Sequence, residues 1–193
     1  KYLLGKGGGG IPEHTHTYAE LESKEKDILL SSSKKQGEHE GRDAFNSILK
    51  KQKIPFYIEW KNPNRNHSHR VIVYKRLTPI DNIDMWTLFT NNWFSSRRGV
   101  KNNINRDFKL FSSYSDAKSD KNPWKFCNYD DPGVGFPRDC GPHRGVGGQW
   151  MSMSRGRGYG WENWSFTLKG IKGSLPDHTH DVVAPHSHNK SLL

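Results

Sequence analysis

Short aromatic-rich segments dominate the middle of this 193-residue chain and restrict the folds that it can adopt. The chain contains seven Trp, nine Phe and seven Tyr residues, which concentrate between Phe45 and Phe166. Within residues 54–172, Gly, Asn and Pro interrupt the aromatic segments at intervals of roughly ten to fifteen residues, a spacing typical of short strands joined by turns. We therefore predict an all-β fold, in which an antiparallel β-sandwich or a barrel-like sheet forms the central domain.

The clearest local pattern is a hairpin at the start of this domain. The segments IPFYIEW (54–60) and HSHRVIVYKRL (67–77) are rich in β-branched and aromatic residues, and NPNRN (62–66) between them is typical of a turn. Further strands are expected in DMWTLFTNNWF, RDFKLFSSYSD, WKFCNY, QWMSMSR and NWSFTLKGI.

Before the hairpin, one apolar face indicates a short helix. Phe45, Ile48 and Leu49 in RDAFNSILKK (42–51) recur at the spacing of helical turns. Residues 18–38 alternate in charge and are expected to form a short surface helix or to be disordered. The predicted organisation is a Gly- and His-rich extended segment (1–17), a polar, partly helical linker (18–53), the aromatic-rich β domain (54–172) and a His-rich extended tail (173–193).

The formal net charge of +10 favours an anionic partner, such as an acidic glycan, another anionic polymer or nucleic acid. Two clusters place cations beside aromatic rings, an arrangement that suits sugar rings and also single-stranded nucleic acid. The candidate ligand-binding residues are Trp93, Arg97, Arg98, Arg155, Arg157, Tyr159 and Trp161. An aromatic core with a solvated basic rim is the alternative interpretation of both clusters.

Cys127 and Cys140 are the two cysteines of the chain, and they flank the turn-rich segment CNYDDPGVGFPRDC. A disulfide is expected to close this loop, and in the chain-entropy model it would stabilise the fold by ~3 kcal/mol. Because disulfides persist in oxidising compartments, we expect an extracellular or virion location, with two reduced thiols as the alternative. No apolar run approaches the ~18 residues of a membrane span. The chain begins at Lys1 rather than Met, so we expect a processed product or a fragment.

Eight of the ten histidines form His-x-His pairs, namely His14/His16, His67/His69, His178/His180 and His186/His188. Residues i and i+2 of a strand point to the same face about 6.6 Å apart, whereas on a helix they diverge by about 200°. We therefore expect rows of imidazoles on extended backbone. Imidazole is a common ligand of transition metals, but one pair is an incomplete site, which a second strand or the copies in a homotrimer would complete. Solvent-exposed pairs without metal are the alternative.

The proline-led units PEHTH, PDHTHDVV and PHSHN resemble the histidine-rich repeats of bacteriophage tail-fibre and receptor-binding proteins. In that family such units recur along slender trimeric fibres of β structure and line the threefold axis, where they hold iron or other transition metals. The resemblance is limited to the terminal segments, and it implies a homotrimer with iron or zinc bound by His14, His16, His178, His180, His186 and His188. His67 and His69 lack the leading proline and are implied only weakly.

From these patterns we interpret the chain as a non-enzymatic structural and adhesion protein of a fibre or virion-like assembly, whose β domain binds a surface glycan or another anionic ligand. The first alternative is a secreted monomeric lectin-like or metal-binding β-sandwich protein, and the second is a nucleic-acid-binding protein. A copper or zinc enzyme that adds His39 or His143 to one pair is the third. The sequence contains no nucleophile elbow, phosphate loop or HExxH motif.

Overall fold

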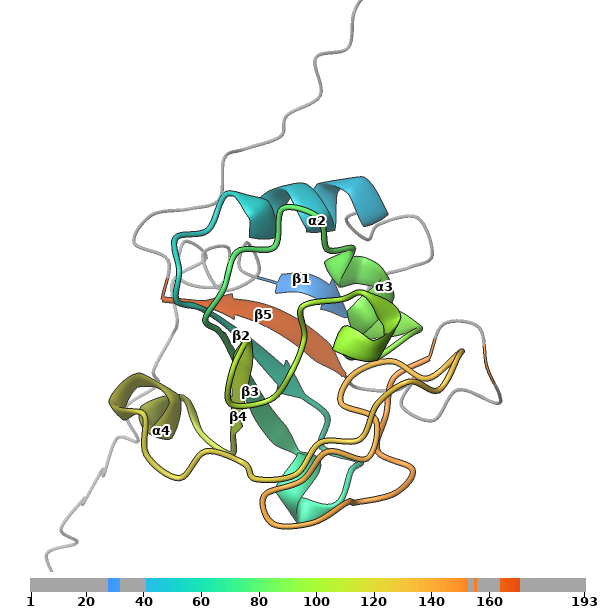
Figure 1. Ribbon diagram of the computed structural model, residues 1–193. Helices are drawn as coiled ribbons and strands as arrows, with labels where there is room; N and C mark the ends of the chain where they lie inside the picture. The colour runs from blue at the N-terminus through green and yellow to red at the C-terminus, as the bar shows by residue number, and fades with distance from the viewer. Residues whose placement is uncertain (1–27, 32–40, 153–154, 156–163, 171–193) are drawn as a thin grey trace, which may run out of the picture.

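An open, five-stranded antiparallel sheet lies at the centre of the computed structural model, which describes residues 28–31, 41–152, 155 and 164–170 (Figure 1). Across the sheet the strands follow the order β1 (Ile28–Ser31), β5 (Ser165–Lys169), β2 (Phe56–Lys61), β3 (Val71–Arg76) and β4 (Phe108–Phe111). All neighbouring strands are antiparallel. The predicted antiparallel and mainly β character is confirmed, whereas the described strands form one sheet that neither closes into a barrel nor stacks on a second sheet.

The predicted hairpin and the predicted helix are both present. Strands β2 and β3 pair along their full length, as the two segments around NPNRN indicate. Helix α2 (Arg42–Lys50) ends one residue before the predicted boundary and buries Phe45, Ile48 and Leu49. Local patterns were sufficient to predict both elements. Helix α2 has one apolar face that the core covers, and the two strands are rich in β-branched and aromatic residues.

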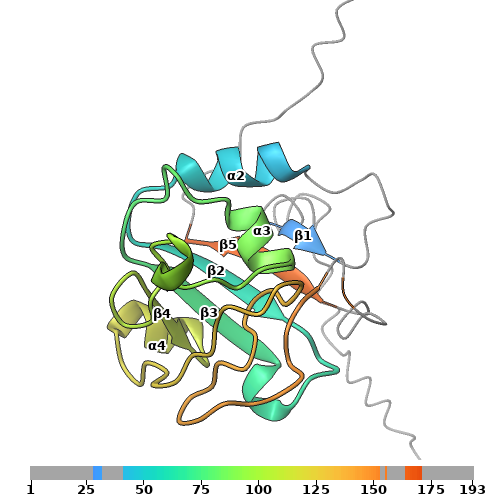
Figure 2. The ribbon, with the colours of Figure 1, turned by 45° about the vertical axis from the view of Figure 1, so that its right-hand side comes forward.

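The two faces of the sheet are covered by different elements. On one face, alternate residues of the strands pack with α2, with α3 (Met85–Thr90) and with a long loop (Figures 1 and 2). The strand residues of this core are Phe56, Ile58, Trp60, Ile72, Tyr74, Phe108, Leu110, Phe166 and Leu168. On the opposite face, Ala117 of α4 (Tyr114–Ser119) packs against Val73 and Phe111. The main core therefore lies between the sheet and the α2–α3 layer.

The irregular segment 120–152 takes the place that a second sheet would have in a sandwich. Its aromatic side chains Trp124 and Phe136 are buried, and Phe136 stacks on Phe89 of α3 with ring centroids 4.8 Å apart. The Phe136 N–H donates to the Phe89 carbonyl at 3.1 Å, so the loop backbone is satisfied inside the core. A disulfide between Cys127 and Cys140 joins the two arms of this segment, which confirms the predicted bond.

The segment DMWTLFTNNWF was predicted as a strand, and this prediction is wrong because it contains α3. Asp84 caps the helix by accepting a hydrogen bond from the Thr87 N–H. Met85, Leu88 and Phe89 are buried at helical spacing, so the helical period fits the core better than the strand period. Short apolar runs are compatible with both periods, and the capping residue distinguishes them here.

Three further segments differ from the predictions. WKFCNY contributes only an isolated bridge between Phe126 and Gly141, and the described part of QWMSMSR is irregular. Residues 28–31, expected in a surface helix or a disordered stretch, form β1 and pair with β5. Since α2 also belongs to the core, the folded domain begins well before residue 54.

Candidate anion-binding surface

Most of the predicted metal ligands lie outside the described residues. These are His14, His16, His178, His180, His186 and His188, and the same holds for Arg157, Tyr159 and Trp161 among the predicted ligand-binding residues. Their roles stay predictions. In the part of the chain that the structure describes, no group of three or more His, Cys, Asp or Glu side chains is arranged to hold a metal ion.

The His67/His69 pair does not form the expected row of imidazoles. Both residues lie in a 3-10 helix, η1 (His67–His69), and strand β3 begins only at Val71. His67 is exposed, whereas His69 is fully buried. The ring nitrogens of His69 are hydrogen-bonded, Nδ1 with Ser68 Oγ at 2.9 Å and Nε2 with the Cys140 carbonyl at 2.8 Å. The premise of two side chains on one strand face is therefore wrong for this pair.

Trp93 was predicted as a surface platform, but its side chain is fully buried. The indole Nε1–H donates to Cys127 Sγ at 3.2 Å, and the ring lies nearly parallel to that of Tyr129 with centroids 6.3 Å apart. It also packs edge-on against Phe136. Trp93 is a core residue because α3 and the disulfide-linked segment enclose it from both sides, so it has no face free for a ligand.

Arg97 and Arg98 are exposed, and they lie on a loop that carries further cations. This loop, residues 95–107, contains the short 3-10 helix η2 (Ser96–Arg98) and is called the basic loop below. Lys101 and Arg106 on the same loop are also exposed. The sequence pattern had selected only the two arginines next to an aromatic residue, although RRGVK already places Lys101 three residues beyond Arg98.

Hydrogen bonds from inside the protein hold the basic loop in one conformation. At its start, Ser95 donates to both carboxylate oxygens of Asp130, through N–H at 2.9 Å and Oγ at 2.8 Å. In its middle, the fully buried Asn102 donates to the Phe94 carbonyl at 3.0 Å, and the Ile104 N–H donates to the Tyr129 hydroxyl at 2.7 Å. A loop anchored at these points fixes the backbone positions from which its exposed side chains project.

The guanidinium of Arg76 fastens the same loop to the sheet. Arg76 is fully buried on β3, and it donates to the carbonyl oxygens of Thr78 at 2.7 Å and Lys101 at 2.8 Å. It also donates to the Tyr74 hydroxyl at 3.1 Å. A buried cation is stable only when its donors are satisfied, and here backbone carbonyls satisfy them. This contact connects the position of Lys101 to the core.

The basic loop contains more basic than acidic side chains. Asp107 is buried and pairs with Arg106 at 3.0 Å. Burial disfavours its charge, but the hydrogen bond from the Asn103 N–H and the guanidinium of Arg106 outweigh this effect and lower the pKa of Asp107. Arg98 lies over the ring of Phe94, 5.6 Å from its centroid. Among the described residues, neither Arg97 nor Lys101 has an ion pair, so the loop presents net positive charge to solvent.

Residues of the basic loop line two pockets. One, of about 360 Å³, is lined by Ser95, Ser96, Arg97, Asn103, Asn128, Tyr129 and Asp130. The other, of about 630 Å³, is lined by Gly99, Lys101, Arg106 and Asp107 together with residues 78–79 and 81–83. Arg97, Lys101 and Arg106 thus lie beside concave surface, where an anionic group can be partly enclosed.

Arg155, the remaining predicted cation, lies near the start of this loop. Its exposed side chain donates to the Pro132 carbonyl at 3.3 Å and packs along Gly133. The same turn holds Asp130, the partner of Ser95. Segment 130–133 therefore contacts both Arg155 and the start of the basic loop, and the structure brings these predicted residues to one region.

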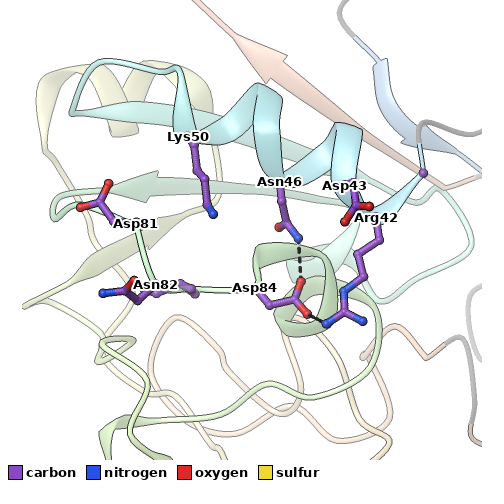
Figure 3. A pocket seen from close by; sticks show the side chains of 9 residues that line it. Arg42, Asp43, Asn46, Lys50, Asp81, Asn82 and Asp84 are labelled. Carbon is purple, nitrogen blue, oxygen red and sulfur yellow. Dashed lines mark hydrogen bonds and ion pairs between the residues drawn. The ribbon is translucent and has the colours of Figure 1, made fainter.

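A third pocket, of about 620 Å³, lies between α2 and the start of α3 (Figure 3). Its centre is the Asp84 carboxylate, which accepts hydrogen bonds from Asn46 Nδ2 at 2.8 Å, from the Thr87 N–H at 3.2 Å and from Arg42. Burial opposes ionisation, but these hydrogen bonds outweigh it and lower the pKa of Asp84. Because the oxygens are already used to fasten α2 to α3, this pocket is a structural junction.

Comparison with protein families, with curated proteins and with solved structures finds no match. Every helix in the described part of the chain is too short or too polar to cross a bilayer. The basic loop and its two pockets are therefore assigned from their own geometry and charge.

Proposed function

We propose that this protein is a binding protein whose folded domain recognises an anionic polymer through the basic loop, and that the natural ligand is an acidic glycan at a surface. The observation that carries the proposal is the display of Arg97, Arg98, Lys101 and Arg106 from one anchored loop beside two pockets. A loop backbone that is ordered before binding loses little conformational entropy on binding, which favours a defined site over a diffuse basic surface.

Binding suits the chemistry of this region better than catalysis. Two carboxylates at the loop, Asp107 within it and Asp130 at its start, are both held in structural hydrogen bonds. Neither is free to act as a general base, and the exposed charged side chains of the loop itself are basic. A site of this kind retains an anionic ligand without transforming it.

The histidine-rich ends add a second part to the proposal. By their resemblance to tail-fibre repeats, we propose that they join copies of the chain into a homotrimer and bind iron or zinc, in a fibre or virion-like assembly outside the cytosol. The support for this part is the recurrence of proline-led His-x-His units in the sequence. Oligomerisation would also place several basic loops on one particle and raise the avidity for a repetitive polymer.

The test compares two triple variants with the same change in charge. Arg97→Ala/Arg98→Ala/Lys101→Ala removes cations from the basic loop, whereas Lys50→Ala/Lys51→Ala/Lys53→Ala removes three exposed lysines at and beyond the end of α2. Binding to heparin is measured by calorimetry over a range of salt concentrations. The loop variant should lose at least about tenfold in affinity, and its slope of log K against log salt should fall by about three.

The α2 variant should stay close to the unchanged protein in both measurements. Equal losses in the two variants would mean that net charge alone attracts the polymer, and the proposed site would be wrong. An unchanged protein that binds no acidic polysaccharide would contradict the proposed function altogether.

A further inference from the structure

Phe126 is exposed, whereas most of the other aromatic residues that the structure describes are buried. Its side chain is 39% exposed, and among the described residues only one other large hydrophobic side chain, Ile54 at 40%, is comparably open to solvent. Burying a Phe ring stabilises a fold by about 1.5–3 kcal/mol. A ring that gives up much of this stabilisation is a candidate for contact with a ligand.

The backbone around Phe126 is unusually well fixed for an exposed loop. Phe126 and Gly141 form an antiparallel bridge, with N–H to carbonyl distances of 3.3 Å and 3.0 Å in the two directions. The next pair of residues along the two arms, Cys127 and Cys140, is joined by the disulfide. The two arms run side by side in Figure 1, where they are yellow and orange. Phe126 is therefore held in place by its main chain.

Gly145 packs directly against the edge of the Phe126 ring. A Cβ atom at Gly145 would lie 3.1 Å from Cε1 of the ring and 3.3 Å from the Asp139 carbonyl oxygen. A larger residue at this position would press on the ring and cover part of it. The glycine lets the loop support the ring edge while the ring stays accessible.

Polar and charged residues lie on the chain segments next to this ring. Lys125, His143 and Arg144 are exposed, and the Lys125 N–H donates to the Pro142 carbonyl at 2.9 Å, which brings the two basic segments together. Asp139 is partly exposed, and its Oδ2 accepts a long hydrogen bond from Asn128 at 3.4 Å. An exposed aromatic ring, two exposed basic residues and a partly exposed carboxylate thus lie on neighbouring segments of the two arms.

The same surface connects to the basic loop. The Asn105 side chain donates to the Trp124 carbonyl at 3.1 Å, and Trp124 immediately precedes Lys125. The end of the basic loop therefore contacts the segment that carries Phe126.

We propose that Phe126 is the stacking platform for one pyranose ring of the acidic glycan, with Lys125 and Arg144 binding the sulfate or carboxylate groups of that sugar and Asp139 accepting a hydrogen bond from a hydroxyl. The proposal rests on the proposed function and identifies the ligand chemistry of the same binding protein. A sugar fits better than single-stranded nucleic acid, because proteins that bind single strands stack successive bases on several aromatic residues. Among the described residues, Phe126 is the one exposed Phe, Tyr or Trp side chain.

The experiment compares Phe126→Ala with Ile54→Ala, a matched loss of an exposed hydrophobic side chain elsewhere on the protein. Calorimetry measures binding of three probes by the full chain: a heparin oligosaccharide, polyvinyl sulfate, which has the charge without sugar rings, and an oligothymidine. Phe126→Ala should weaken binding of the oligosaccharide about tenfold, as for a central aromatic contact. It should leave the affinity for polyvinyl sulfate unchanged, and Phe126→Trp should restore oligosaccharide binding.

Three results would overturn the platform. The first is an unchanged affinity of Phe126→Ala for the oligosaccharide, and the second is an equal loss for polyvinyl sulfate or in Ile54→Ala. In both cases the triple alanine variant of the basic loop still tests the proposed function separately. The third is a dependence on Phe126 for oligothymidine alone, which would assign the surface to nucleic acid. Near-ultraviolet circular dichroism of each variant verifies that the disulfide-linked arms keep their packing.

Discussion

The Nε2 atom of His69 lies 2.8 Å from the carbonyl oxygen of Cys140, and this hydrogen bond joins η1 to the disulfide-linked segment. Since a carbonyl oxygen only accepts, Nε2 carries the proton. The ring of Trp124 covers the imidazole, with centroids 5.0 Å apart. A histidine selected by its sequence as a metal ligand is thus a buried structural link beneath the proposed binding surface.

This burial predicts a dependence of stability on pH. Desolvation is the main cause that lowers the pKa of His69 from 6.5 to about 4, although the Cys140 carbonyl opposes the shift. Between pH 6.5 and about 4, His69 is protonated in the unfolded chain but stays neutral in the folded chain. The free energy of unfolding therefore falls as the pH decreases through this interval. The total loss should be about 3 kcal/mol.

Urea titrations between pH 4 and 7 measure this effect. His69→Phe should flatten the profile in this interval, at a cost of about 1–3 kcal/mol at pH 7 because the Cys140 carbonyl loses its buried donor. His67→Ala changes an exposed histidine and should keep the profile of the unchanged protein. A steep profile that survives in His69→Phe would assign the pH dependence to other groups.

The junction at Asp84 predicts a second effect on stability. Asp84→Ala removes the cap of α3 and the contacts to Asn46 and Arg42, so the free energy of unfolding should fall by about 1–2 kcal/mol at pH 7. Because the folded pKa of Asp84 is lowered, its contribution is complete above the unfolded pKa and disappears as the pH falls through the folded value. The difference between variant and unchanged protein should therefore shrink in acid.

Asp81→Ala is the control for this prediction, since Asp81 lines the same pocket but is exposed and has no hydrogen bond to another described residue. Equilibrium unfolding in urea at pH 7 and at pH 3 separates the two variants. If Asp81→Ala is as destabilising as Asp84→Ala, the stability of the junction comes from general electrostatics and the hydrogen bonds of Asp84 have no special role.

Gly135 predicts a steric effect in the layer that replaces the second sheet. A Cβ atom at this position would lie 2.6 Å from the Phe89 carbonyl oxygen and 2.7 Å from the Met151 carbonyl oxygen. Both are backbone atoms in the core, so Gly135→Ala forces the segment away from α3 and should destabilise the fold by about 2–4 kcal/mol.

Gly147→Ala is the matched control, because its Cβ would meet only an Asp139 carboxylate oxygen, at 3.9 Å. Thermal unfolding monitored by tryptophan fluorescence should show a large decrease in midpoint for Gly135→Ala and a small change for Gly147→Ala. Equal midpoints would show that segment 120–152 can shift away from α3 at little cost.

Several elements of the fold could be predicted because their patterns are local. The apolar face of residues 42–51 and the β-branched and aromatic segments around NPNRN indicate an amphipathic helix and a hairpin without reference to the rest of the chain. Cys127 and Cys140 lie 13 residues apart across a turn-rich loop, so their pairing could also be anticipated. Arg97 and Arg98 are exposed, and their role in binding stays a prediction.

By itself, the sequence determined the antiparallel β character, the hairpin, α2 and the disulfide, since each depends on neighbours close along the chain. Only the tertiary structure decided which aromatic rings are buried and which is open. Trp93 and Phe126 belong to similar aromatic segments, yet α3 and segment 120–152 enclose one, whereas the bridge to Gly141 holds the other at the surface. Burial depends on contacts between residues far apart in sequence, and the spacing of residues along the chain does not predict these contacts.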